Sequence, residues 1–349
     1  MSDLTPHDPA LAPLPAKKSF HMGLVVIPLA LVGLLAAGWS AFWYQQVNKF
    51  EARLDELIER EASLGKQWTC AQRKIGGFPF RLEATCGATS LVLKDAGLSL
   101  GIGTVRAVAQ AYDPSLMIIE ADGPMQITNQ ASETWTTKWE LARSSVRLDL
   151  KNLKDLPERS SLEIKSISVF APNNPKVSTT IESIDVQARR NPEKFATERA
   201  YDLAFTVTNL VDFMLAEITK TNDPLTLSYD LTITRNPEPS KKPLPEQLEL
   251  WRSQGGLVTL RQMMVNRGPF NLVMSGEMGL DAQHRPDFRL DTKVKGLDEL
   301  LKASGQKADI LNLLGGKRAA SGEMTFNLRT QSGQAFLGPL PLGKMPPLY

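Results

Sequence analysis

The pattern of hydrophobic and polar positions changes twice along the chain, and it begins with an uninterrupted apolar stretch. Residues 24–44 contain no charged side chain. As a helix rising about 1.5 Å per residue, this stretch covers roughly 30 Å, the hydrocarbon thickness of a bilayer. Lys17 and Lys18 precede it, which is the basic flank expected on the cytoplasmic side. Its far end carries the aromatic residues Trp39, Trp43 and Tyr44. The sequence therefore predicts a transmembrane helix over residues 23–44.

A cleaved secretory signal is the alternative interpretation of this stretch, because it lies early in the chain. However, the apolar run exceeds the about 7–15 residues of a signal core, and it ends in bulky rather than small side chains. We therefore expect an uncleaved single-pass anchor in the inner membrane. By the positive-inside rule, the proline-rich residues 1–22 then form a disordered cytoplasmic tail, and the bulk of the chain lies in the periplasm.

Residues 45–66 show a helical period of apolar positions. The apolar positions are Phe50, Leu54, Leu57, Ile58 and Leu64. The spacing predicts an amphipathic helical stalk that continues the membrane helix. A short coiled-coil seam through Val47, Leu54 and Ile58 is the alternative, but about two heptads are too few to define one. We expect the stalk to pack on the domain that follows.

After Gly65 the pattern becomes mostly alternating, which predicts strands with one apolar face. The alternating segments are 78–85, 135–141, 146–150, 162–169, 225–234, 288–294 and 324–328. In segment 162–169 the apolar alternation shifts by one residue between Ile164 and Ile167, which indicates a β-bulge. Short helices are expected at 245–253, 297–302 and 308–314, whereas 205–219 is ambiguous.

No alternation of strands and helices typical of a parallel sheet is visible. Residues 67–349 are therefore predicted to form a mainly β (α+β) domain built on a large, mostly antiparallel and curved sheet with a few short helices. Such a sheet can close into a barrel, pack on a second sheet, or curl around helices or a ligand. The pattern alone leaves these three open.

Cys70 and Cys86 are the two cysteines of the chain, and both follow the predicted anchor. In an oxidising compartment the simplest interpretation of such a pair is a disulfide, and closing a loop of this size is worth roughly 3 kcal/mol in the chain-entropy model. Two free thiols and a metal pair are the alternatives. No CxxC motif and no nearby histidine supports a metal or redox pair.

Composition excludes two broad classes of protein. A formal net charge of +2 with acidic and basic residues interspersed gives no basic stripe, so we expect no nucleic-acid partner. An apolar content of 42% is ordinary for a folded chain and excludes general disorder.

Candidate catalytic chemistry is sparse. His7 and His21 precede the membrane stretch, which leaves His284 in a turn with Arg285 and Asp287. No G-x-S-x-G elbow presents a serine to that histidine. The carboxylate pairs Glu51/Asp55 and Asp281/Asp291 are the alternative candidates, for a glycosidase. Solvated faces and turns contain such pairs routinely, so we expect no enzymatic activity, no catalytic residues, no cofactor and no metal.

Two stretches carry a resemblance to a known family. Residues 68–86 hold Cys70 and Cys86 around the block Gly77-Phe78-Pro79-Phe80-Arg81, and residues 333–349 are rich in glycine and proline. Together with the anchor they resemble the bacterial family DUF2125, which carries no assigned activity. Within this block, Phe78 and Phe80 are expected to anchor the first strand in the core, since aromatics on one strand face are usually packing residues.

A weaker likeness concerns residues 270–301, which are similar to the repeats of AsmA-like envelope proteins. That resemblance implies an N-terminal anchor and a long β-groove associated with lipid handling. The expected function is thus a membrane-anchored, non-enzymatic periplasmic protein that binds lipid or another hydrophobic ligand. The alternatives are an envelope scaffold that binds other envelope proteins through a fully packed sheet and, more remotely, a hydrolase.

Overall fold

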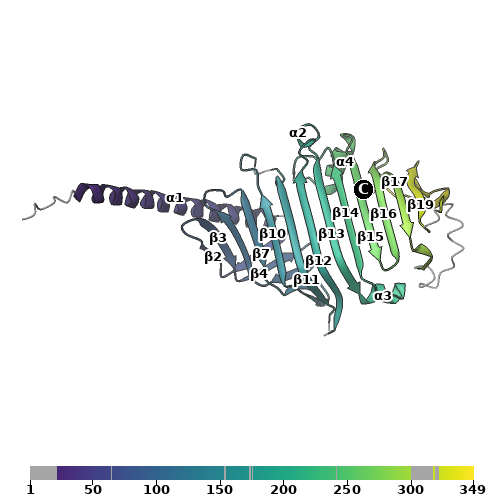
Figure 1. Ribbon diagram of the computed structural model, residues 1–349, viewed down its shortest axis with the longest axis horizontal. Coiled ribbons are helices and arrows are strands. Elements are labelled where there is room, and N and C mark those ends of the chain that lie inside the picture. The colour runs from purple at the N-terminus through teal and green to yellow at the C-terminus, as the bar shows by residue number, and fades with distance from the viewer. Residues whose placement is uncertain are drawn as a thin grey trace, which may run out of the picture.

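A single long helix precedes a large antiparallel sheet (Figure 1). The computed structural model describes residues 22–63, 65–152, 155–172, 174, 176–240, 242–299, 317–318 and 322–349. The predicted membrane helix and the predicted stalk are one continuous helix, α1 (Met22–Ser63). In the described part of the chain, α1 is the helix long and apolar enough to cross a membrane. The predicted tail lies, apart from Met22, outside the described residues.

The sheet confirms the predicted mainly β class, and all of its strand pairs are antiparallel. The strands of its N-terminal half are β1 (Lys66–Ala71), β2 (Lys74–Gly76), β3 (Arg81–Cys86), β4 (Ala88–Leu93), β5 (Leu98–Ile102), β6 (Val105–Gln110), β7 (Leu116–Ala121), β8 (Met125–Thr128), β9 (Thr134–Lys138) and β10 (Leu141–Arg147). The strands that follow are β11 (Arg159–Phe170), β12 (Val177–Arg190), β13 (Tyr201–Asp212), β14 (Leu225–Ile233), β15 (Val258–Arg267), β16 (Phe270–Leu280), β17 (Pro286–Lys295), β18 (Lys317–Arg318), β19 (Met324–Gln331), β20 (Gln334–Leu337) and β21 (Leu340–Lys344).

The sheet forks at β11. One edge of this strand pairs with β12 along its length, whereas the other edge pairs with β10 up to Lys165 and with β9 from Ser168 onward. Between the two pairings, Ser166 has a left-handed backbone with φ of 55°, at the position where the sequence predicts a slip in phase. The first arm of the fork runs β10-β7-β6-β3-β2, and the second arm runs β9-β8-β5-β4-β1.

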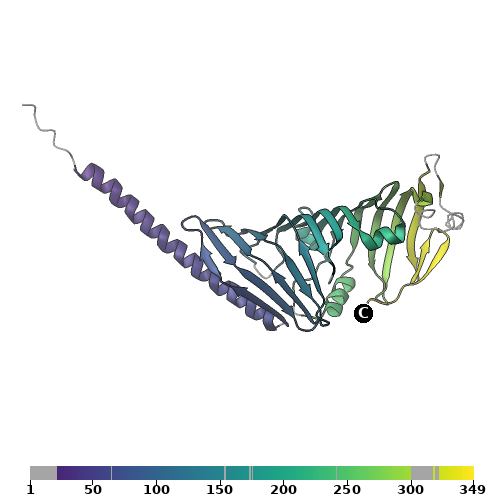
Figure 2. The same cartoon turned by 90° about the horizontal axis from the view of Figure 1, so that it is seen from below.

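The two arms form two layers (Figure 2). Strand alternation places Cys86 on the side of Leu82 and Ala84, and Cys70 on the side of Trp68. Because Cys70 and Cys86 are joined by a disulfide, these two sides are opposed. We call β1–β10 the two-layer half of the sheet.

Beyond β11 the sheet continues as one layer of neighbouring strands, from β12 through β17 to β19, β20 and β21 (Figure 1). We call β12–β21 the single-layer half. Its connections hold the short helices α2 (Phe195–Glu198), α3 (Phe213–Thr219) and α4 (Leu244–Ser253). Among the described strands, β21 is the outer one at this end, since its pairing is with β20.

Several predicted boundaries are corrected by the structure. Segment 135–141 is not one strand but the end of β9 and the start of β10. The ambiguous segment 205–219 contains the end of β13 and then α3, because the carboxylate of Asp212 accepts a hydrogen bond from the Leu215 backbone N–H at 2.9 Å and caps the helix. Helix α4 confirms the helix predicted at 245–253. The helices predicted at 297–302 and 308–314 fall mainly on residues outside the described part.

Candidate functional site

One apolar face runs across the sheet from β11 into the single-layer half. Directly opposed residues of antiparallel strands share a face, so the register shows which side chains line up. A central row contains Leu162, Val186, Phe205, Tyr229, Met263, Met274, Thr292 and Phe326. The flanking rows contain Ala188, Leu203, Leu231, Leu260, Gly276, Leu290 and Leu328, and Ile164, Ile184, Val207, Leu227, Val265, Leu272, Val294 and Met324. We call these three rows the apolar face.

The apolar face is incompletely buried. Toward the C-terminal end, Val294, Met324 and Phe326 form a small core cluster. Between β12 and β16, by contrast, most members of the three rows are half-buried, including Phe205, Tyr229 and Met263. No large side chain among the described residues is less than 2% exposed. A domain of this size normally buries such a face against a second layer, so apolar surface is left for contact with something else.

The opposite face of the single-layer half is polar and internally satisfied. Its centre is Asp202, a buried carboxylate that accepts hydrogen bonds from Asn191 at 2.9 Å and Thr232 at 2.8 Å. The guanidinium groups of Arg189 and Arg261 each lie 3.1 Å from it. Burial by itself raises the pKa of Asp202, but these hydrogen bonds outweigh it and lower the pKa to about 2. This face therefore has the character of a structural lattice of ion pairs.

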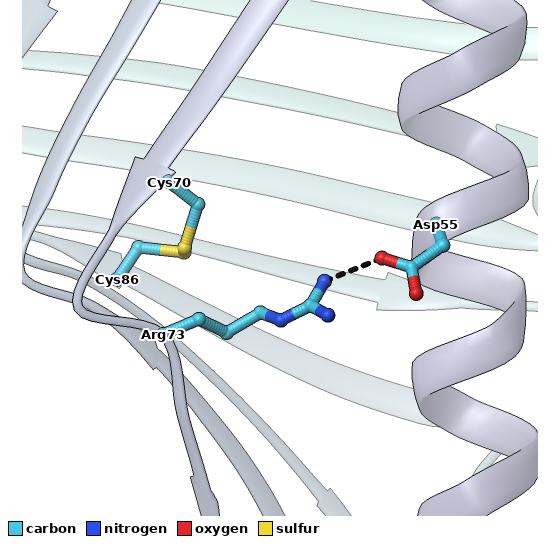
Figure 3. Close-up of a disulfide and its surroundings, with 4 residues drawn as sticks. All are labelled: Asp55, Cys70, Arg73 and Cys86. Carbon is cyan, nitrogen blue, oxygen red and sulfur yellow. Dashed lines mark hydrogen bonds and ion pairs between the residues drawn. A yellow bond between two sulfur atoms is a disulfide. The ribbon is translucent and has the colours of Figure 1, made fainter.

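Helix α1 closes the open end of the fork. Its C-terminal part places Val47, Phe50, Leu54 and Ile58 half-buried along one side, in agreement with the predicted packing of the stalk. Asp55 of this part is 2.6 Å from the guanidinium of Arg73, and this hydrogen bond lowers the pKa of the Asp55 carboxyl (Figure 3).

The disulfide lies beside this ion pair (Figure 3). Cys70 of β1 and Cys86 of β3 have Cα atoms 5.2 Å apart, so the bond ties the outer part of the second arm to the first arm. Among the described residues no cysteine is free. The disulfide, Arg73 and α1 thus hold three elements together where the fork would otherwise open.

The expected core position of Phe78 and Phe80 is wrong, because these side chains are 53% and 60% exposed. The first strand of the block begins only at Arg81, and Phe78-Pro79-Phe80 forms the turn before it. The turn packs on α1 instead of entering the core. The ring of Phe78 lies 5.3 Å from that of Trp43, and the ring of Phe80 lies 6.0 Å from that of Trp39.

The two tryptophans of α1 also bond to the same turn. The indole N–H of Trp39 donates to the Pro79 carbonyl at 2.8 Å, and that of Trp43 donates to the Arg81 carbonyl at 2.8 Å. Trp43 is buried together with Leu82 and Ala111. The last turns of the predicted membrane stretch 24–44 therefore contact the sheet, and the block Gly77–Arg81 is where they do so.

The candidate catalytic residues have ordinary structural partners. The ring of His284 stacks on Tyr349 at 4.5 Å, and its Nε2 lies 3.3 Å from a Glu249 carboxylate oxygen. Asp281 is bonded to Arg285 in the same turn at 2.7 Å, and Asp291 accepts from Asn327 at 3.0 Å. Within the described ranges, no group of three or more His, Cys, Asp or Glu side chains is arranged to hold a metal ion. The absence of enzymatic activity stays a prediction.

Sequence reasoning found the alternating strands but missed the continuous apolar face. The signal was present in each strand separately, as in the leucines and Tyr229 of β14. Joining these signals into one surface requires the register of neighbouring strands, which is set by pairs distant in sequence.

The long apolar helix and the large open sheet with one apolar face define a class of β-sheet proteins with a potential N-terminal membrane anchor. Within that class, the chain belongs to the family described as "Uncharacterized protein conserved in bacteria (DUF2125)", whose model matches residues 43–346. No curated protein and no solved structure matches the chain. The likeness to AsmA-like envelope proteins stays a prediction.

Proposed function

We propose that this protein is a non-enzymatic, membrane-anchored periplasmic protein that binds phospholipid acyl chains along its apolar face. The observation that carries the proposal is the incomplete burial of three continuous apolar rows between β12 and β16. Covering such a surface lowers the free energy of the protein, because apolar side chains are removed from water. An acyl chain is the ligand that matches a surface of aliphatic, aromatic and methionine side chains.

The dimensions of the apolar face support this ligand class. Its rows cross eight strands from β11 to β19, and a strand spacing of about 4.8 Å makes each row roughly 34 Å long. One bilayer leaflet contributes about 15 Å of hydrocarbon, so a whole acyl chain fits along a row. Each CH₂ group left in water costs about 0.8 kcal/mol. An apolar surface of this kind therefore stabilises a lipid outside the bilayer.

The N-terminal segment supports the proposed location. Helix α1 is apolar and exposed at every described side chain from Val26 to Gly38, as expected for a segment surrounded by lipid. The proposed arrangement is a single-pass anchor in the inner membrane with a cytoplasmic N-terminus, which carries the sheet on the periplasmic side.

The proposal is tested by photocrosslinking with the full-length protein in vesicles. The vesicles contain a phospholipid with a diazirine at the end of one acyl chain, and crosslinked peptides are mapped by mass spectrometry. We expect adducts on apolar-face residues of β14, β15 and β16 as well as on α1. Adducts confined to α1 would leave the anchor in place and overturn lipid binding by the sheet.

Two neighbouring substitutions sharpen this test. Met263→Glu puts a charge in the central row of the apolar face, whereas Gln262→Glu puts the same charge on the exposed polar face of the same strand. We expect Met263→Glu to abolish the adducts on β14–β16 and Gln262→Glu to preserve them. Equal adducts in both variants would contradict the proposal.

A second candidate function, an envelope interaction protein, is favoured by α3. This short helix exposes Phe213, Met214 and Ile218, each more than 60% accessible, at the end of β13. An exposed apolar patch of this kind is typical of a protein contact. A photocrosslinker at position 214 in intact cells is expected to capture a defined envelope protein if this function holds, and to yield only uncrosslinked chain if it does not.

A further inference from the structure

Five exposed aromatic side chains lie on α1 and on two turns beside it, at one corner of the two-layer half. They come from α1, from the turn before β3 and from the turn between β6 and β7. They are Phe42, Tyr44, Phe78, Phe80 and Tyr112, and their exposed fractions are 38%, 61%, 53%, 60% and 64%. We call this group the aromatic collar. Aromatic side chains this exposed and this close together are unusual for a surface that faces only water.

The collar is held by backbone hydrogen bonds rather than by loose loops. The Arg81 N–H donates to the Gly77 carbonyl at 2.8 Å and closes the turn that carries Phe78 and Phe80. The Ala111 N–H donates to the Phe80 carbonyl at 2.8 Å and attaches the neighbouring turn with Tyr112. Gly77 has φ of 97°, and a Cβ atom there would lie 2.6 Å from the Arg81 carbonyl oxygen. The backbone hydrogen bonds therefore fix the two turns that carry Phe78, Phe80 and Tyr112.

The position of the collar along α1 coincides with the expected membrane surface. From Val26 to Gly38 the described side chains of the helix are exposed, and the first hydrogen bond from the helix to the sheet domain comes from Trp39. Seventeen residues, 22–38, extend about 25 Å as a helix, close to the hydrocarbon thickness of a bilayer of roughly 30 Å. Trp39 and the collar thus lie at the depth where aromatic belts form.

We propose that the aromatic collar inserts into the headgroup region of the membrane and docks the sheet against the phospholipid surface. In the docked position the rings would contact the upper part of the acyl chains instead of water. Arg81, exposed beside Phe80, offers a cation to the lipid phosphates. This inference rests on the membrane anchor of the proposed function but not on lipid binding by the apolar face.

The test uses p-benzoylphenylalanine in the full-length protein reconstituted into vesicles of phosphatidylethanolamine and phosphatidylglycerol. The photoreactive residue replaces Phe78, Phe80 or Tyr112 in separate variants. Leu34, exposed on the apolar part of α1, is the positive control, and Phe213 of α3, 66% exposed and outside the collar, is the matched control. Intact-mass spectrometry after illumination measures a mass increase of one phospholipid.

We expect lipid adducts at positions 34, 78, 80 and 112 and none at position 213. Adducts at position 34 alone would overturn docking while leaving the anchor intact. Equal yields at positions 78 and 213 would overturn it as well, because they would show unspecific adhesion. Absence of adducts at position 34 would remove the anchor and the collar together. None of these outcomes depends on crosslinks to β14–β16, which test the proposed function separately.

Discussion

The two halves of the sheet are built from the same alternating strands but solve the burial of their apolar sides differently. In the two-layer half, the arms of the fork oppose their apolar sides, and Leu82, Ala84 and Ala109 are buried. In the single-layer half, no second sheet lies over the apolar face in the described part of the chain. Strand pattern alone therefore does not decide whether a face is covered. The cause is β11, because one of its edges pairs with both β10 and β9 and so divides the sheet into two layers.

The two halves are also stabilised by different interactions. The two-layer half is cross-linked by Cys70–Cys86 and closed by α1. The single-layer half has long strands and a hydrogen-bonded lattice around Asp202 on its polar face. The disulfide thus stabilises the two-layer half and the polar lattice stabilises the single-layer half, where a compact domain would rely on core packing. Three predictions test this division, and they are given in decreasing order of effect.

The largest effect is expected from removing the disulfide. Cys70→Ser together with Cys86→Ser should lower the stability of the two-layer half by about 3 kcal/mol, because the loop between them is no longer closed in the unfolded chain. Hydrogen exchange of the full-length protein in nanodiscs should accelerate in β1 and β3 and stay unchanged in β14 and β15. Uniform acceleration over both halves would show that they are one cooperative unit and would break the comparison.

A smaller effect is expected from Asp202. Its folded-state pKa of about 2 lies below the ordinary value of 3.8. The ionised form is therefore favoured by folding, and its contribution of about 2 kcal/mol is fully present above pH 4 and lost as the pH falls through 2. Exchange in β13–β15 should rise over this range in the wild-type protein.

The variant Asp202→Asn should remove that acid dependence and destabilise the single-layer half at neutral pH by a similar amount. Asp291→Asn, on the exposed polar side of β17, is the control that should change little. If the acid dependence is unchanged in Asp202→Asn, groups other than Asp202 cause it.

The smallest effect is expected from a matched pair of tryptophans. Trp43→Phe keeps a ring against Leu82 but loses the hydrogen bond to the Arg81 carbonyl, and Trp251→Phe loses an equivalent 2.8 Å bond to the Thr234 carbonyl. Each should cost about 1 kcal/mol. Exchange should accelerate near β3 in the first variant and near β14 in the second. A response of both regions in either variant would indicate coupling between the halves.

Local pattern was sufficient for much of this architecture. The unbroken apolar stretch and the helical spacing after it predict α1, and proline at the start with glycines beyond the end predict α4. The predicted slip before Ile167 falls at Ser166, whose backbone is left-handed, but the expected β-bulge is not there, because the register with β12 shifts only between Val169 and Phe170. Each of these depends on residues close in sequence, where propensity and periodicity act directly.

The rest depends on contacts between distant residues. That β9 and β10 share one edge of β11 follows from pairings such as Lys138 with Ser168, which no local pattern contains. The outward position of Phe78 and Phe80 follows from tryptophans in α1, roughly forty residues earlier. The apolar face required the register of eight strands, so its rows were visible only one strand at a time.

The outer strand β21 has a consequence for molecules crowded on one membrane. A sheet that does not close offers the free N–H and C=O groups of its last strand to any other chain, which is how edge-to-edge polymers begin. Here that strand contains Pro341, which has no N–H to offer, and ends at the charged Lys344. Pro346 and Pro347 follow after Met345. The proline and the charged lysine therefore disfavour further backbone hydrogen bonding at β21, and with it the association of neighbouring copies into fibres.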